Sequence, residues 1–131
     1  MQFYQEMKAI KDGLEILGHD VLVPKEVEDN TIPIEALPGT TDEEKITAKI
    51  EYDFIREHFF KIQVSEAILI LNYEKKGIPG YIGGNTFLEM GYAFGFGKKI
   101  YLMFPIPKTE YSVEMFSMQP IVIDGDITKI K

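Results

Sequence analysis

The sequence predicts an α/β fold in which a parallel sheet is covered by helices on both faces. Segments with helical spacing of apolar residues alternate with short apolar runs, in the order αβ, αβ, αβ, αβ. The runs show no alternation of polar and apolar residues, which is typical of strands buried on both sides. Hydrophobic residues make up 45% of the chain, enough for the core of a single domain over residues 1–131.

The first αβ pair lies at the start of the chain. Apolar residues at helical spacing predict a helix over residues 2–17, and Gly18 is suited to end it as a C-cap. The run Val-Leu-Val-Pro at 21–24 predicts a short buried strand that its proline ends. Residues 25–40, interrupted by prolines and a glycine, are expected to form a loop.

The second αβ pair opens with a helix-start signal. Thr41 and Glu44 have the spacing of a capping box, and the apolar positions that follow predict one long helix with a broad apolar face up to Ile62. The continuous run Ala-Ile-Leu-Ile-Leu-Asn at 67–72 predicts a buried strand. Residues 73–83 then form a glycine-rich loop.

The last two pairs are shorter. We expect helices over about 85–96 and 111–118, and strands over 99–104 and 121–123. Ligands of open parallel sheets bind beyond the carboxyl ends of the strands. The segments predicted to meet at that edge follow Pro24, Asn72 and Phe104.

One element of a doubly wound domain is missing from this order. Such domains usually begin with a strand, whereas this chain begins with a helix. The first strand is therefore absent, supplied from elsewhere, or encoded before residue 1.

Composition excludes several classes of function. A net charge of −7 without a basic cluster argues against a duplex nucleic acid partner, so a bound anion would need backbone N–H groups. The absence of cysteine excludes disulfides and thiolate chemistry, and His19 and His58 are too far apart in sequence for a local metal pair. With no membrane-length apolar run and no leader pattern, we expect a cytoplasmic protein. The predicted function implies no metal or redox cofactor.

The segment Gly-Gly-Asn-Thr-Phe-Leu-Glu, residues 83–89, combines a glycine turn with a helix start. In a structural interpretation Thr86 is the N-cap and Glu89 is the third helical residue of a capping box. In a functional interpretation Gly83 and Gly84 let a ligand approach the backbone, and the rigid helix holds Glu89 at a ligand crevice as nucleophile or general base. Spacing alone leaves both interpretations open.

The longer stretch GGNTFLEMGYAFGFGKKIYLM, residues 83–103, resembles the signature segment of the nucleoside 2-deoxyribosyltransferase superfamily. That superfamily includes the 2′-deoxynucleoside 5′-phosphate N-hydrolases. Residues 8–24 resemble its first helix and second strand, and residues 65–70 its central strand entry. The resemblance covers nearly the whole chain, although only the Glu-Met-Gly-Tyr-Ala block within it is moderately specific.

This resemblance implies a flavodoxin-like or Rossmann-like three-layer sandwich that lacks the usual first strand. It also implies cleavage or transfer at the N-glycosidic bond of a (deoxy)nucleoside or its 5′-monophosphate, with Glu89 as the nucleophile. Where the family often carries an aspartate, this chain has His58, which could act as acid or base or be a structural histidine. A homodimer or larger homo-oligomer is expected by the same resemblance.

The remaining candidate residues would contact the substrate. Tyr81, Tyr73 and Phe104 are aromatic candidates for stacking on a nucleobase, although each taken alone is more often a packing residue of the core or a loop. Transferase and hydrolase activity remain open, as do base and sugar preference, and the alternative is a non-catalytic nucleotide-binding module. The predicted substrate-binding set is Gly83, Gly84, Asn85, Asn72, Tyr81, Tyr4, Glu114 and Ser117.

Overall fold

The computed structural model describes residues 4–24, 41–52 and 54–131. The chain divides into two compact units, residues 1–61 and residues 62–131. The regular elements described in the first unit are helices. They are α1 (Tyr4–Ile16), α3 (Asp42–Tyr52) and all but the end of α4 (Phe54–Gln63).

Helix α1 confirms the predicted first helix, apart from residues 1–3, which lie outside the described residues. Leu14 is its buried side chain. The helix ends as the sequence predicts, because Gly18 adopts a φ of +94°, which glycine tolerates without steric cost. The amide of Gly18 donates to the carbonyl of Glu15, and the amide of His19 donates to the carbonyl of Leu14, so these two carbonyls in the last turn of the helix are satisfied.

The strand predicted over residues 21–24 is not present as a paired strand. A short apolar run becomes a strand only when a neighbouring strand satisfies its backbone groups. Here the carbonyl of Val23 accepts a hydrogen bond of 2.8 Å from Nζ of Lys61, so a side chain satisfies it instead. Val23 is nonetheless buried, as its apolar character predicts. The loop predicted over residues 25–40 lies outside the described residues.

The predicted capping box is confirmed at the start of α3. The amide of Glu44 donates to Oγ1 of Thr41 over 3.1 Å, and the amide of Thr41 donates to Oε1 of Glu44 over 3.3 Å. The single long helix predicted from this point is described as two helices, α3 and α4, with residue 53 outside the described residues. The apolar face predicted for this helix is buried at Ile62, whereas Ile46, at its other end, is exposed.

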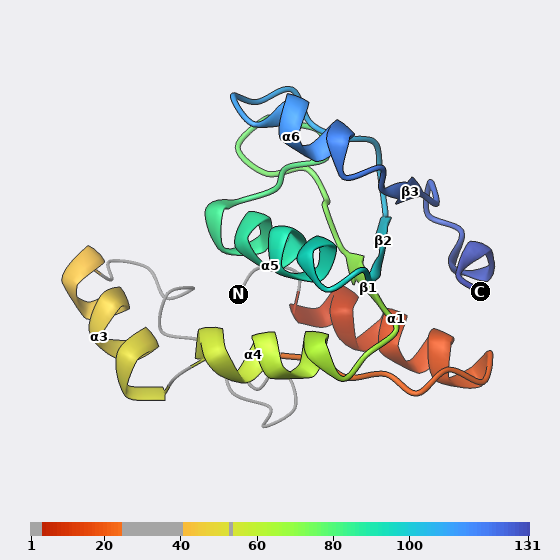
Figure 1. The fold of residues 1–131 in the computed structure, drawn as a ribbon, viewed down its shortest axis with the longest axis horizontal. Coiled ribbons are helices and arrows are strands. Elements are labelled where there is room, and N and C mark those ends of the chain that lie inside the picture. Colours follow the sequence, from red (N-terminus) through yellow and green to blue (C-terminus); the bar gives the residue numbers. More distant parts are fainter. Residues whose placement is uncertain (1–3, 25–40, 53) are drawn as a thin grey trace. The chain divides into compact units, whose positions relative to one another are not determined.

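The second unit contains a three-stranded parallel sheet in the order β1-β2-β3 (Figure 1). The amide of Met103 extends the β1–β2 pairing by donating to Ile70, and the amide of Ile123 extends the β2–β3 pairing by donating to Leu102. The strands are β1 (Ala67–Ile70), β2 (Lys99–Leu102) and β3 (Ile121–Val122).

Two helices connect these strands, as expected for parallel neighbours. Helix α5 (Gly84–Gly95) joins β1 to β2 and packs on both, and α6 (Ser112–Ser117) joins β2 to β3. A 3-10 turn, Ile127–Lys129, follows the last strand and has no counterpart in the sequence prediction. The core of this unit includes Met90, Ala93, Ile100, Tyr101, Leu102, Met103, Met115 and Ile123, all with at most 4% of their surface exposed.

The described residues therefore form a mixed helix and strand structure with a small open parallel sheet, compatible with the predicted α/β class. The sheet has three strands in the part of the chain that the structure describes, instead of the predicted four. The missing strand is the unpaired segment 21–24.

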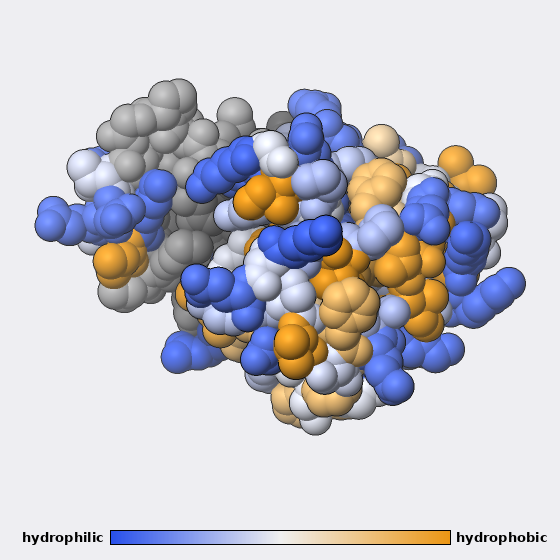
Figure 2. Space-filling model, turned by 90° about the horizontal axis from the view of Figure 1, so that it is seen from above, coloured by the Kyte–Doolittle hydropathy of each residue, from blue (hydrophilic) through white to orange (hydrophobic). Residues whose placement is uncertain are grey.

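Several large apolar side chains of the second unit remain at the surface. Figure 2 shows hydrophobic groups set among hydrophilic ones on the face in view. Because single exposed apolar residues are normal in folded proteins, these side chains alone indicate no function. Those at least 50% exposed on or beside α5 and α6 are Leu88, Phe94, Phe96, Tyr111, Val113 and Phe116.

Candidate functional site

Asn72 connects the two loops that leave the carboxyl ends of β1 and β2. Its side chain is fully buried. Nδ2 donates to the carbonyl of Phe104 over 2.7 Å, and Oδ1 accepts from the amide of Phe104 over 2.9 Å. The same Nδ2 lies 3.4 Å from the carbonyl oxygens of Gly80 and Pro105. The side-chain amide of Asn72 thus extends the hydrogen bonding between the neighbouring parallel strands β1 and β2 beyond their carboxyl ends.

The loop after β1 is held in shape by its own turn. Lys75 and Ile78 pair across two backbone hydrogen bonds, and between them Lys76 and Gly77 have φ values of +56° and +74°. Two consecutive left-handed residues are typical of a type I′ hairpin turn. This loop closes against the loop after β2 at Gly80, where a Cβ atom would lie 2.4 Å from the carbonyl oxygen of Pro105.

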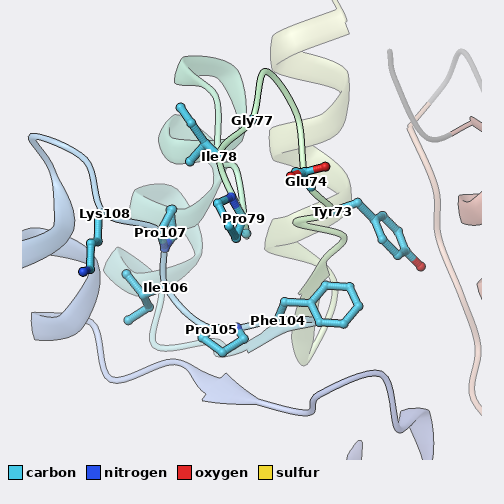
Figure 3. A pocket seen from close by; sticks show the side chains of 11 residues that line it. Tyr73, Glu74, Gly77, Ile78, Pro79, Phe104, Pro105, Ile106, Pro107 and Lys108 are labelled. Atoms are coloured by element: carbon cyan, nitrogen blue, oxygen red, sulfur yellow. The ribbon is translucent and has the colours of Figure 1, made fainter.

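A groove of about 850 Å³ lies between these two loops (Figure 3). Figure 3 shows Tyr73, Glu74 and Phe104 towards one end and Lys108 at the other. The Tyr73 and Phe104 rings meet edge to face, with centroids 5.4 Å apart and an interplanar angle of 63°. The groove lies at the carboxyl edge of the sheet, which is the position that the sequence predicts for a ligand site. The lining residues are Tyr73, Glu74, Gly77, Ile78, Pro79, Gly80, Phe104, Pro105, Ile106, Pro107 and Lys108.

Helix α5 begins earlier than the sequence predicts, and the capping-box interpretation of its start is wrong. Gly83 is the N-cap, in an extended conformation, and no side chain caps the helix. The first helical hydrogen bond runs from the amide of Phe87 to the carbonyl of Gly83. Thr86 is therefore the third helical residue, and Glu89 lies in the second turn. Glycine is acceptable at an N-cap, so the backbone starts the helix without help from Thr86 or Asn85.

Glu89 lies on a polar flank of α5. Its side chain is half-buried, and Oε1 accepts a hydrogen bond of 3.5 Å from Nδ2 of Asn85, one turn earlier. One turn later on the same flank, the hydroxyl of Tyr92 donates to Oε1 of Gln63 over 3.4 Å. The buried face of α5, with Met90 and Ala93, fixes which way this flank points. The structure thus brings together Asn85 and Glu89, both predicted from the sequence, and Glu89 is not among the residues that line the groove.

Tyr81, Gly83 and Gly84 lie at the entrance to α5. A Cβ atom on Gly83 would be 3.4 Å from Cε1 of Tyr81, so the ring lies directly against this glycine. Two lysine side chains also lie near the Tyr81 ring: Nζ of Lys75 is 5.5 Å from the ring centroid, and Nζ of Lys76 is 5.9 Å from it. A Cβ atom on Gly84 would meet no atom within 4 Å, so open space lies beside this glycine.

Glu114 and Ser117 lie on α6 and are exposed. The hydroxyl of Ser117 donates to the carbonyl of Val113 within the helix. The segment before α6 approaches α5 through Tyr111, whose ring stacks on Phe87 with centroids 5.1 Å apart. Contacts of Glu114 and Ser117 with a substrate stay predictions.

Tyr4 and His58 belong to the first unit, whereas the other predicted site residues belong to the second. Tyr4 begins α1, and its ring lies 5.0 Å from Nζ of Lys8. His58 is a half-buried residue of α4. Their predicted roles, substrate contact for Tyr4 and acid or base for His58, stay predictions.

Sequence reasoning missed most of the groove. Tyr73 and Phe104 are candidates because they are aromatic, but Glu74, Ile106 and Lys108 carry no such signal. The prolines at 79, 105 and 107 could have indicated two stiff loops at the same sheet edge. Gly80 between them could have indicated a close approach of backbone.

Asp126 is a carboxylate near the end of the chain whose neighbours change its pKa. The pKa of Asp126 is lowered because the Thr128 hydroxyl and then the Thr128 amide donate hydrogen bonds to its carboxylate, with Lys129 adding a favourable charge. This carboxylate caps the 3-10 turn after β3 and has a structural role. Within the described ranges, no group of three or more His, Asp or Glu side chains could hold a metal ion.

None of the helices in the described part of the chain has the length and apolar character needed to cross a lipid bilayer. The chain matches no protein-family model, no curated protein and no solved structure.

Proposed function

We propose that this protein cleaves or transfers the N-glycosidic bond of a (deoxy)nucleoside or its 5′-monophosphate, with Glu89 as the nucleophile. The observation that carries the proposal is the position of Glu89. It is a half-buried carboxylate on a rigid helix that starts beyond the carboxyl end of β1, and the amide of Asn85 donates to it. The resemblance of residues 83–103 to the nucleoside 2-deoxyribosyltransferase superfamily supports the same assignment.

In this reaction an oxygen of Glu89 attacks C1′ of the sugar and forms a glycosyl ester. The bond between C1′ and the base nitrogen breaks, and the base leaves with the electron pair and takes up a proton. Water or a second base then attacks C1′, which releases the sugar product and restores the carboxylate. Asn85 would hold the carboxylate in one orientation.

The fold in this proposal is a three-layer, flavodoxin-like or Rossmann-like sandwich that extends the observed three-stranded sheet. A homodimer or larger homo-oligomer, expected from the same resemblance, belongs to the proposal as well. Neither is needed for the chemistry at Glu89, and the oligomeric state can be measured separately.

The test measures release of free base by chromatography from deoxynucleosides, with and without a second base, and from deoxynucleoside 5′-monophosphates. We expect Glu89→Gln to lose at least about 100-fold in rate, because the amide cannot form the glycosyl ester. Asn85→Ala should lose less than about tenfold, since it removes only a long orienting hydrogen bond. The matched control is Glu66→Gln, which neutralises an exposed carboxylate at the opposite, amino end of β1.

Full activity in Glu89→Gln would contradict the catalytic assignment. Binding of nucleotide without release of base would instead favour the alternative, a non-catalytic nucleotide-binding module. One observation favours the nucleotide-binding module: Glu89 is not among the residues that line the groove between the two loops.

A further inference from the structure

We infer that the groove between residues 73–80 and residues 104–108 is itself a nucleotide-binding site, in which Lys108 recognises the phosphate. The choice of a nucleotide as occupant rests on the proposed function, but the site does not require Glu89 to be catalytic. The inference is argued from the stiffness of the groove, the character of its walls and the placement of its charges.

The groove is preformed. Asn72, fully buried, bonds to Phe104 on one wall and lies within 3.4 Å of the Gly80 carbonyl on the other, so the two loops cannot separate without breaking these bonds. Pro107 is buried, and its carbonyl accepts a 2.7 Å hydrogen bond from the hydroxyl of Ser112. A ligand therefore meets walls that are already ordered, which lowers the entropic cost of binding.

The walls suit a flat ring. Pro79, Pro105 and Ile106 present apolar surface along the middle of the groove, between the aromatic end and the Lys108 end (Figure 3). Phe104 is half-buried and braced edge to face by Tyr73, so its ring is held in place. Aromatic and apolar surfaces with a few polar groups are typical of pockets for small planar ligands.

The charges distinguish a nucleotide from a purely apolar ligand. Glu74 and Lys108 are the two charged residues of the lining, both exposed, and Figure 3 shows them at opposite ends. A nucleobase carries N–H groups that can donate to a carboxylate, and a phosphate at the far end of the same molecule can accept from an ammonium. In a chain with a net charge of −7, a phosphate needs such a local cation.

The experiment follows binding by isotope-edited NMR, with 2′-deoxyadenosine 5′-monophosphate and 2′-deoxyadenosine as probes, at low salt. We expect the nucleotide to shift the amide signals of Gly77, Gly80 and Ile106 and to bind about tenfold more tightly than the nucleoside. Lys108→Gln should abolish this difference by weakening the nucleotide alone. Lys99→Gln, which removes an exposed lysine at the amino end of β2, should leave it unchanged.

The same titration on Glu89→Gln separates this inference from the proposed function. Binding in the groove that persists in Glu89→Gln supports the inference even if base release is never observed. Three results would overturn it: no shift of the groove signals at millimolar nucleotide, shifts confined to residues outside the groove, or an undiminished nucleotide preference in Lys108→Gln. Matching far-UV circular dichroism spectra would show that the surface variants are folded.

Discussion

Replacement of Asn72 should cost more stability than any surface change in the second unit. Asn72→Ala removes the 2.7 and 2.9 Å hydrogen bonds to the backbone of Phe104. Each bond contributes about 1 kcal/mol net, and a buried backbone group left without a partner costs about 1–3 kcal/mol more. The two lost bonds and at least one Phe104 backbone group left without a partner should together lower the free energy of unfolding by at least about 3 kcal/mol.

Asn72→Asp tests the same bonds with almost no change in volume. It keeps an acceptor for the Phe104 amide but turns a carboxylate towards the carbonyl oxygens of Gly80, Phe104 and Pro105, which the amide now satisfies. Burial and these oxygens should raise the pKa of the new carboxyl in the folded state above its unfolded value. The folded state then binds more protons, so the deficit should be largest at neutral pH and shrink as the pH falls towards the unfolded pKa.

Urea denaturation at pH 7 and at pH 5 measures both effects. The control is Asn85→Asp, the same chemical change at an exposed position in the first turn of α5, which should change stability by less than about 0.5 kcal/mol. If Asn72→Ala and Asn72→Asp cost no more than this control, the side chain does not hold the two loops together. A deficit in Asn72→Asp that grows at pH 5 would contradict the electrostatic part of the argument.

Two further predictions concern backbone and charge. Gly80→Ala should cost at least about 2 kcal/mol, because it adds an overlap with the Pro105 carbonyl to the strain of a φ of +71°, whereas Gly77→Ala, with a similar φ and open space, should cost about 1 kcal/mol. Chemical denaturation measures both, and equal losses would show that the contact at Gly80 can relax. Thr128→Val should raise the pKa of Asp126 towards its ordinary value, as followed by carboxyl NMR, since it removes the hydroxyl that contributes most to the lowering. Because the pKa of Asp126 is lowered in the folded state, the ionised carboxylate stabilises the fold above about pH 4, and this stabilisation is lost as the pH falls through the folded pKa. An unchanged titration of Asp126 in Thr128→Val would refute the role of the Thr128 hydroxyl.

The second half of the chain was predicted well because its signals are local. Continuous apolar runs became β1, β2 and β3, and the alternation of runs with helices correctly indicated parallel pairing. The strand expected at 21–24 failed for a reason that no local pattern contains. An apolar run reports that a segment is buried, and Val23 is buried, but pairing depends on which distant group reaches its carbonyl, here Lys61.

The candidate site shows the same division. The parallel topology predicts that ligand-facing segments follow β1 and β2, and Asn72 is a candidate because it ends a predicted buried strand. Tyr73 and Phe104 are candidates because aromatic rings can stack on a nucleobase. The sequence does not distinguish the roles of Asn72 and Tyr73, which are neighbours in the chain. Asn72 is fully buried between the two loops, whereas Tyr73 lines the groove. Only the three-dimensional distance between the loops shows that Asn72 supports the groove.

The start of α5 changes how Glu89 is interpreted. A carboxylate in the first turn is explained by capping and by the helix dipole, and both effects fade beyond that turn. Because Gly83 is the N-cap, Glu89 lies in the second turn, where neither effect accounts for a half-buried carboxylate. The capping-box interpretation of Glu89 is therefore wrong, and the comparison of Glu89→Gln with Glu66→Gln is the measurement on which the proposed chemistry depends.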